Sequence, residues 1–147
     1  MKGVLLDTGI LIRGLGQRDD SDAASCRRLI DRLKSRRITM YMAAPSYAEM
    51  TRGGGVPGWI SLEFVPFNRR AAEACGRTFP HAFLVDVRRH VDLREHYVKY
   101  DAMIVSCALA HDIGAVVSLD RGVHVLCQKA GLDCYTADAL NEVLGFP

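Results

Sequence analysis

The sequence has no hydrophobic run long enough to cross a membrane. Its longest apolar stretch, residues 102–110, is interrupted by Ser106, whereas a spanning helix needs about 18 apolar residues. Near the start, Asp7 interrupts the apolar residues 4–6, so the pattern of a secretory signal peptide is missing too. We therefore expect a cytoplasmic protein with no membrane partner.

Two common chemical motifs are also missing. The glycine-rich segment 53–58 lacks the GK[ST] ending of a phosphate-binding loop. The cysteines form no CxxC pair, which argues against a zinc ribbon, and their odd number argues against a complete disulfide framework. We expect buried reduced thiols, with any pairing left open, at Cys26, Cys75, Cys107, Cys127 and Cys134.

The overall amino-acid composition is that of an ordinary globular protein. Apolar residues make up 49% and charged residues 24% of the chain, which excludes collagen-like, disordered and low-complexity proteins. A length of 147 residues predicts a single domain over residues 1–147. The net charge of +2 is too small to indicate nucleic-acid binding. Basic residues nevertheless crowd segments 27–37 and 88–99, each either a solvated helix face or a surface for phosphates.

Apolar periodicity predicts strands that alternate with helices. Strands are expected at 3–7, 38–43, 62–65, 115–119 and 133–135. Helices are expected at 8–15, from Asp20 or Ser21 to 36, after Pro45, at 68–96 as two helices or one kinked helix, at 101–112, at 123–130, and after Thr136 or Asp138. This alternation predicts an α/β fold with parallel strands and helices on both faces. Ligands of such sheets bind beyond the carboxyl ends of the strands.

Four acidic residues lie near those expected strand ends. Asp7 follows the first strand, Glu49 lies in the helix after the second, Asp120 follows the fourth, and Asp101 begins the buried helix. Each has an ordinary structural explanation. Asp7 and Asp101 could cap helices, Asp120 could form an Asx-turn, and Ser46 with Glu49 fits the S-x-x-E capping box.

The joint placement of these acids favours a metal site. Three of them are expected at one edge of one sheet, and the fourth at the rim of the core, where an unpaired charge is costly. Clustered carboxylates without matching bases suit hard cations such as Mg²⁺ or Mn²⁺, which prefer oxygen ligands and commonly pair with substrate phosphates. We therefore expect one of these two ions as the cofactor.

The segments around the acids resemble the PIN-domain nucleases in order and spacing. These segments are Val4-Leu5-Leu6-Asp7-Thr8 with Glu49, Tyr100-Asp101-Ala102-Met103-Ile104-Val105, and Val117-Ser118-Leu119-Asp120. Residues 101–145 are most similar to the VapC-type toxins of prokaryotic toxin–antitoxin pairs. The resemblance implies a five-stranded parallel sheet. It assigns catalysis and metal binding to Asp7, Glu49, Asp101 and Asp120, with Thr8 and Ser118 as hydroxyl neighbours.

Two departures from the family pattern concern the neighbourhood of the acids. Gly9 stands where these proteins often have Asn, and residues 121–124 offer no further acid after Asp120. His124 lies in that segment and is interpreted as structural or solvated. A fifth acidic ligand is therefore not expected.

The resemblance implies a divalent-metal-dependent endoribonuclease whose substrate is RNA. It also implies that the chain is the toxin of a VapBC-type pair, with a cognate antitoxin protein as its partner. The alternatives are a PIN nuclease for ribosomal RNA processing and a non-catalytic PIN-like module that binds RNA or protein. A receiver-like phosphoacceptor would need paired acids after the first strand and a lysine after the last strand, and both are missing. A homodimer is expected, with apolar residues for its contact at Phe79, Phe83, Leu84 and Val87.

Overall fold

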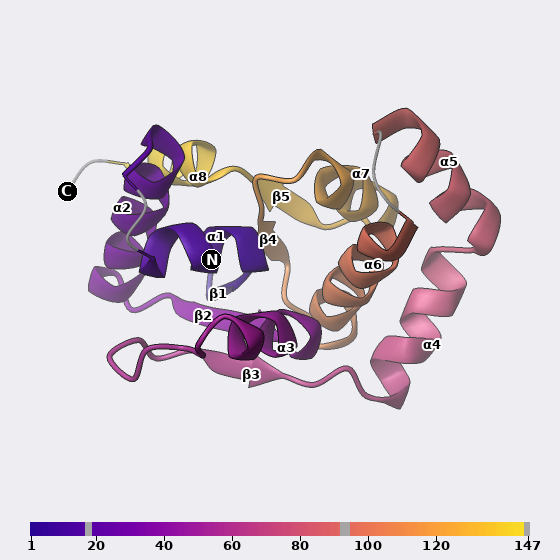
Figure 1. Ribbon diagram of the computed structural model, residues 1–147, viewed down its shortest axis with the longest axis horizontal. Coiled ribbons are helices and arrows are strands. Elements are labelled where there is room, and N and C mark those ends of the chain that lie inside the picture. The colour runs from indigo at the N-terminus through magenta and orange to yellow at the C-terminus, as the bar shows by residue number, and fades with distance from the viewer. Residues whose placement is uncertain (17–18, 92–94, 146–147) are drawn as a thin grey trace.

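The computed structural model describes residues 1–16, 19–91 and 95–145 (Figure 1). Within these ranges, five strands form one parallel sheet in the order β3-β2-β1-β4-β5. The strands are β1 (Gly3–Leu6), β2 (Thr39–Ala43), β3 (Glu63–Val65), β4 (Ala115–Val117) and β5 (Asp133–Tyr135). The helices of the described residues are α1 (Thr8–Leu15), α2 (Ser21–Ser35), α3 (Ala44–Arg52), α4 (Arg69–Thr78), α5 (His81–Val91), α6 (Glu95–Ala110), α7 (Arg121–Ala130) and α8 (Ala137–Val143). The predicted α/β class and the five-stranded parallel sheet are confirmed.

The central strand β1 is buried on both faces. Val4 and Leu6 pack into one apolar cluster with residues of α1, α2 and α8, and Leu5 packs into a second cluster with residues of α4, α6 and α7. Figure 1 shows these two groups of helices on opposite sides of the sheet. All three side chains are 0% exposed, as expected for a continuous apolar run in a parallel sheet with helices on both faces.

Most helix boundaries follow from local signals in the sequence. The Asp20 side chain caps α2 by accepting a hydrogen bond from the Ala23 backbone N–H at 2.7 Å. Pro80 separates α4 from α5, so of the two alternatives given for this region the structure has two helices and not one kinked helix. Residues 92–94 of the segment predicted as 68–96 lie outside the described residues.

Several boundaries differ from the prediction, and three of these lie beside the acids singled out in the sequence. The helix α6 begins at Glu95 and not at Asp101, because residues 95–100 contain no glycine or proline and Val98 extends the buried face by nearly one turn. The strand β4 ends at Val117, two residues early, because the next residues form the turn into α7. The helix α7 begins at Arg121, directly after its Asp120 cap, and not at Val123. Among the described residues, no helix combines the length and the apolar character that crossing a membrane requires.

The strand order places a topological switch point between β1 and β4. The chain runs outward from β1 to β2 and β3, and then returns to place β4 on the other side of β1. In open α/β sheets, the crevice at such a point, outside the carboxyl ends of the strands, is the usual place for a ligand. Asp7 follows β1 there, and its backbone N–H donates to the Val117 carbonyl of β4 at 3.0 Å.

Candidate metal centre

The four acids singled out in the sequence line one pocket of about 260 Å³ at this switch point. Asp7 and Asp120 follow β1 and β4, Glu49 projects from α3, and Asp101 projects from α6. The remaining lining residues are Thr8, Gly9, Arg13 and Leu119. The structure therefore brings together side chains that are far apart in the sequence, from two strand ends and two helices.

Asp7 is the most buried of the four acids. Its side chain is the N-cap of α1 and accepts a hydrogen bond from the Thr8 N–H at 2.8 Å, while the Ser118 hydroxyl donates to its Oδ2 at 2.6 Å. Burial raises the pKa of Asp7 to about 6, and the charges of Asp120 and Glu49 add to this rise, while the two hydrogen bonds partly oppose it. Asp7 is thus a helix cap and a member of an acidic cluster at once.

Ser118 joins two of the acids. Its hydroxyl donates to Asp7 and accepts from the Asp120 backbone N–H at 3.0 Å, and its carbonyl accepts from His124 Nε2 at 2.9 Å. The Asp120 side chain accepts from the Gly122 N–H at 2.6 Å and caps α7, so the Asx-turn interpretation is confirmed. The Ser118 side chain is fully buried, and it therefore fixes the separation of Asp7 and Asp120.

Asp101 is an interior residue of α6, so the interpretation of this acid as a helix cap is wrong. Its Oδ2 is buried and has no hydrogen-bond partner among the described residues. Burial, followed by repulsion from the charges of Asp7, Asp120 and Glu49, raises the pKa of Asp101 to about 8. A carboxylate in this setting needs a proton or a cation, because an uncompensated buried charge is costly.

Glu49 does not belong to a capping box. The helix α3 begins at Ala44, two residues before Ser46, because Pro45 is well suited to the first turn of a helix and Ala43 takes the extended conformation of an N-cap residue. Ser46 is therefore inside the helix and Glu49 in its second turn, where the Glu49 side chain is half-buried and lines the pocket. The capping box is the structural explanation that the sequence offers for Glu49, and the structure excludes it.

The residues present suit a hard divalent cation. In the described part of the chain, no three His, Cys, Asp or Glu side chains already form a closed metal-binding group, so the acids line the pocket without meeting at one point. The pocket offers carboxylate and hydroxyl oxygens, the donors that Mg²⁺ and Mn²⁺ prefer. The buried, unpartnered oxygen of Asp101 and the hydroxyl of Thr8, also buried without a partner among the described residues, are donors that an ion or its water would satisfy.

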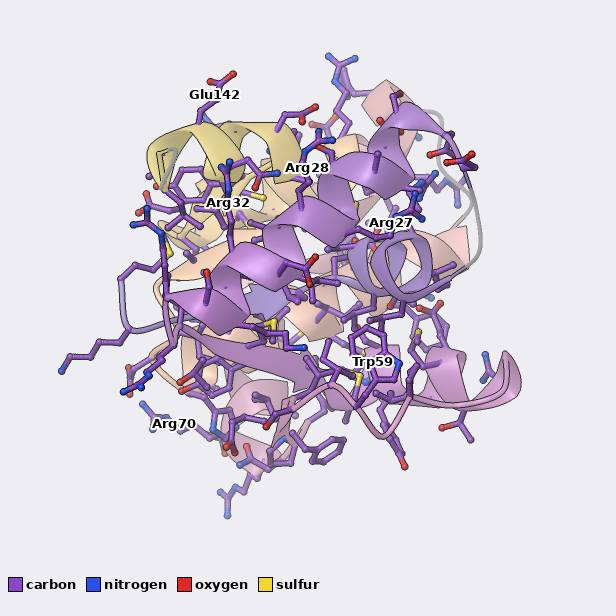
Figure 2. The ribbon with its side chains drawn as sticks, turned by 90° about the vertical axis from the view of Figure 1, so that its left-hand side faces the viewer. Arg27, Arg28, Arg32, Trp59, Arg70 and Glu142 are labelled. Carbon is purple, nitrogen blue, oxygen red and sulfur yellow. The ribbon has the colours of Figure 1, made fainter. Side chains whose placement is uncertain are left out.

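The basic residue at the pocket is not one of those that the charge pattern singled out. Arg13 of α1 lines the pocket, whereas Arg28, Arg32 and Arg36 of the 27–37 segment line a separate pocket beside α2. Figure 2 shows Arg28 and Arg32 on the α2 face next to α8, where Arg32 donates to the Asn141 carbonyl at 2.5 Å. The sequence does contain one signal for Arg13. Arg13 lies one helical turn after Gly9, and Gly9 lies two residues after Asp7, so Arg13 and Gly9 share one face of the helix that follows Asp7.

The chain belongs to the PIN-domain family, because the family model described as PIN domain matches residues 4–129. This range contains all four acids of the pocket. The resemblance noted in the sequence is therefore confirmed for the family.

Among solved structures, the fold is similar to the crystal structure of FitAcB from Neisseria gonorrhoeae, with a TM-score of 0.54 and 14% sequence identity. That match covers 91% of this chain and 97% of the other, and at such low identity it shows the fold alone. A Leishmania major tyrosyl-tRNA synthetase in complex with tyrosinol matches with a TM-score of 0.44 and 15% identity, covering 92% of this chain and 26% of that one. A comparison with curated proteins gives no match.

Proposed function

We propose that the chain is a divalent-metal-dependent endoribonuclease, acting as a single PIN-like domain over residues 1–147. The observation that carries the proposal is the unpartnered Oδ2 of Asp101, buried beside three further acids at the topological switch point of the sheet. Four carboxylates around one pocket are difficult to explain by stability, since each raises the cost of ionising its neighbours. Membership of the PIN family makes a nuclease site the expected use of this cluster.

In this proposal, Asp7, Glu49, Asp101 and Asp120 hold Mg²⁺ or Mn²⁺. When bound, the ion lowers the pKa of a water molecule and neutralises charge on the substrate phosphate, which permits in-line attack on phosphorus. The chain itself needs no covalent nucleophile. Ser118 keeps Asp7 and Asp120 in place through its hydroxyl, and Asp7 and Asp101 give up their protons when the ion enters. By analogy with other metal-dependent nucleases, the products carry a 5′-phosphate and a 3′-hydroxyl.

The substrate class and the partners in this proposal rest on the family resemblance. We infer single-stranded or loop RNA as the substrate, a VapBC-type toxin as the biological role, a cognate antitoxin as the protein partner, and a cytoplasmic homodimer. Phe79 and Val87 are each 3% exposed and belong to the core, so Phe83 and Leu84, which are half-buried, are the residues of the predicted contact that stay available to a second copy. A small antitoxin reading frame beside the gene would support the toxin role over ribosomal RNA processing.

The test is an RNA cleavage assay with and without divalent metal. Cleavage of single-stranded RNA should require Mg²⁺ or Mn²⁺ and should stop in EDTA. Asp7→Asn and Asp101→Asn should abolish it. Asp20→Asn is the matched control, because Asp20 also caps a helix but lies outside the pocket, and Asn caps almost as well as Asp.

The outcomes separate the candidate functions. Cleavage that persists in EDTA would exclude the metal chemistry. Tight RNA binding without cleavage, in protein that responds to metal, would favour the non-catalytic PIN-like module. Full activity of both pocket variants would remove the acids from the site.

A further inference from the structure

Arg13 is the one basic side chain among the residues that line the acid pocket in the described structure. It lies in the last turn of α1, one helical turn after Gly9. A β-carbon added at Gly9 would lie 3.6 Å from Arg13 Nη1, and no other atom outside the immediate backbone would be within 4 Å of it. The guanidinium group therefore extends back along α1, over the bare backbone of Gly9, toward the acids.

The Arg13 side chain lies at the pocket with a hydrogen-bond donor that the described residues leave unused. Its Nε is buried and has no acceptor in the described part of the chain, and the structure shows no ion pair there between Arg13 and a pocket acid. A buried guanidinium N–H with no acceptor costs free energy, which a bound anion would recover. By contrast, the Arg28 guanidinium lies 3.9 Å from the Asp138 carboxylate, and Arg32 donates to a helix carbonyl.

The position of Arg13 beside the acids indicates which anion it binds. An RNA strand in this pocket presents a chain of phosphates, of which the acids and their metal ion engage one. The guanidinium group has a planar fork of N–H donors that fits two oxygens of one phosphate. We propose, on the basis of the nuclease function above, that Arg13 binds the phosphate next to the one that is cleaved and so fixes the strand's position in the pocket.

An internal role as counter-ion to the acids is the competing explanation. It would require an ion pair between Arg13 and one of them, and the described residues contain none. The counter-ion explanation also predicts a different response to mutation of Arg13. Loss of a counter-ion would change how the pocket binds metal, whereas loss of a phosphate contact would change how the protein binds RNA and how that binding depends on salt.

The experiment compares Arg13→Gln and Arg13→Lys with the wild type and with Arg36→Gln. Arg36 is exposed and follows α2, near the amino ends of the strands and away from the acids. Steady-state cleavage of a single-stranded RNA is measured in Mn²⁺ between about 50 and 200 mM KCl. Each lost phosphate contact on a single strand should reduce the slope of log(kcat/KM) against log[KCl] by about 0.7.

Arg13→Gln should raise KM about tenfold, the loss expected for one charge-assisted contact, with a smaller change in kcat. Its salt slope should be shallower than that of the wild type. Arg13→Lys keeps the charge but not the fork, so it should keep the slope and show an intermediate KM. Arg36→Gln should match the wild type in both. An unchanged slope and KM in Arg13→Gln would overturn the proposal.

The metal-induced rise in melting temperature separates this inference from the nuclease function itself. Arg13→Gln should show the same rise in Mn²⁺ as the wild type, because Arg13 contacts RNA and not the ion. An altered rise with unchanged salt slope would identify Arg13 as a counter-ion and refute the phosphate role. If wild-type protein neither cleaves RNA nor responds to Mn²⁺, the function and this role of Arg13 both fail. If wild type cleaves and Arg13→Gln equals it, only the role of Arg13 fails.

Discussion

Asp101→Asn should make the metal-free protein more stable at neutral and alkaline pH while removing its activity. The substitution removes one ionisable carboxyl from the four acids that line the pocket and keeps the size of the side chain. Burial and the three neighbouring acids raise the pKa of Asp101 from 3.8 to about 8. Because the folded-state value lies above the unfolded one, the stability that protonated Asp101 contributes is complete below about pH 4. It is lost as the pH rises through about 8.

The expected gain in the free energy of unfolding is the difference between two opposing effects: relief of the cost of ionising Asp101, and the cost of burying the Asn amide without a partner. A rise in pKa from 3.8 to about 8 sets an upper limit of about 6 kcal/mol on the cost of ionising Asp101 in the folded state. Water in the open pocket screens part of this cost. The Asn amide also leaves a buried polar group without a partner at the position of Oδ2, which costs about 1–3 kcal/mol. We expect a net gain of about 2 kcal/mol at pH 8, or about 5 °C in melting temperature for a chain of this size.

Thermal unfolding followed by circular dichroism in EDTA, between about pH 5 and 9, measures this gain. The difference between Asp101→Asn and wild type should shrink toward pH 5 and should be largest from about pH 8 upward. Asp20→Asn, which changes a cap outside the pocket, should follow the wild-type curve throughout. A variant that melts below wild type at pH 8, with the same pH dependence, would refute the idea that Asp101 is held against the repulsion of its neighbours.

Two further predictions concern the same pocket, and a third concerns the oligomeric state. In wild type, Mg²⁺ or Mn²⁺ should raise the melting temperature, and the rise should grow between about pH 6 and 8.5 because binding displaces protons from Asp7 and Asp101; a pH-independent rise would place the ion elsewhere. Ser118→Ala should cost about 1–3 kcal/mol in denaturant unfolding and weaken the metal response, since it breaks both hydrogen bonds of the hydroxyl. Light scattering at micromolar concentration should give the mass of a dimer, and a monomer mass would contradict the predicted homodimer.

The sheet and its acids could be predicted from the sequence because their signals are local. An apolar run that ends in an acid, such as residues 4–7, marks both a buried strand and the residue at its carboxyl end. Repeated at 115–120 within an alternation of strands and helices, this pattern places Asp7 and Asp120 at one edge. The rules for parallel crossovers then supply the rest of the geometry.

The features that were missed depend on more than local pattern. The helix α3 begins at Ala44, two residues before Ser46, with Pro45 in its first turn, so a sequence that fits the capping box is inside the helix. The start of α6 has no glycine, proline or capping signal near Asp101 to mark it, and only packing of Val98 reveals that the helix begins earlier. The place of Arg13 at the pocket depends on how α1 is oriented toward Glu49 and Asp101, because helical spacing alone does not say which side of a helix faces a pocket.

The site also depends on the order in which the chain is made. Asp7 and Glu49 leave the ribosome long before Asp101 and Asp120, and β1 waits for β4, where Leu5 pairs with Val116. A nascent or truncated chain that stops before Ala115 lacks Asp120 and also leaves the central strand β1 without one of its two neighbours. Only a chain that extends past Asp120 can therefore assemble the complete acid pocket.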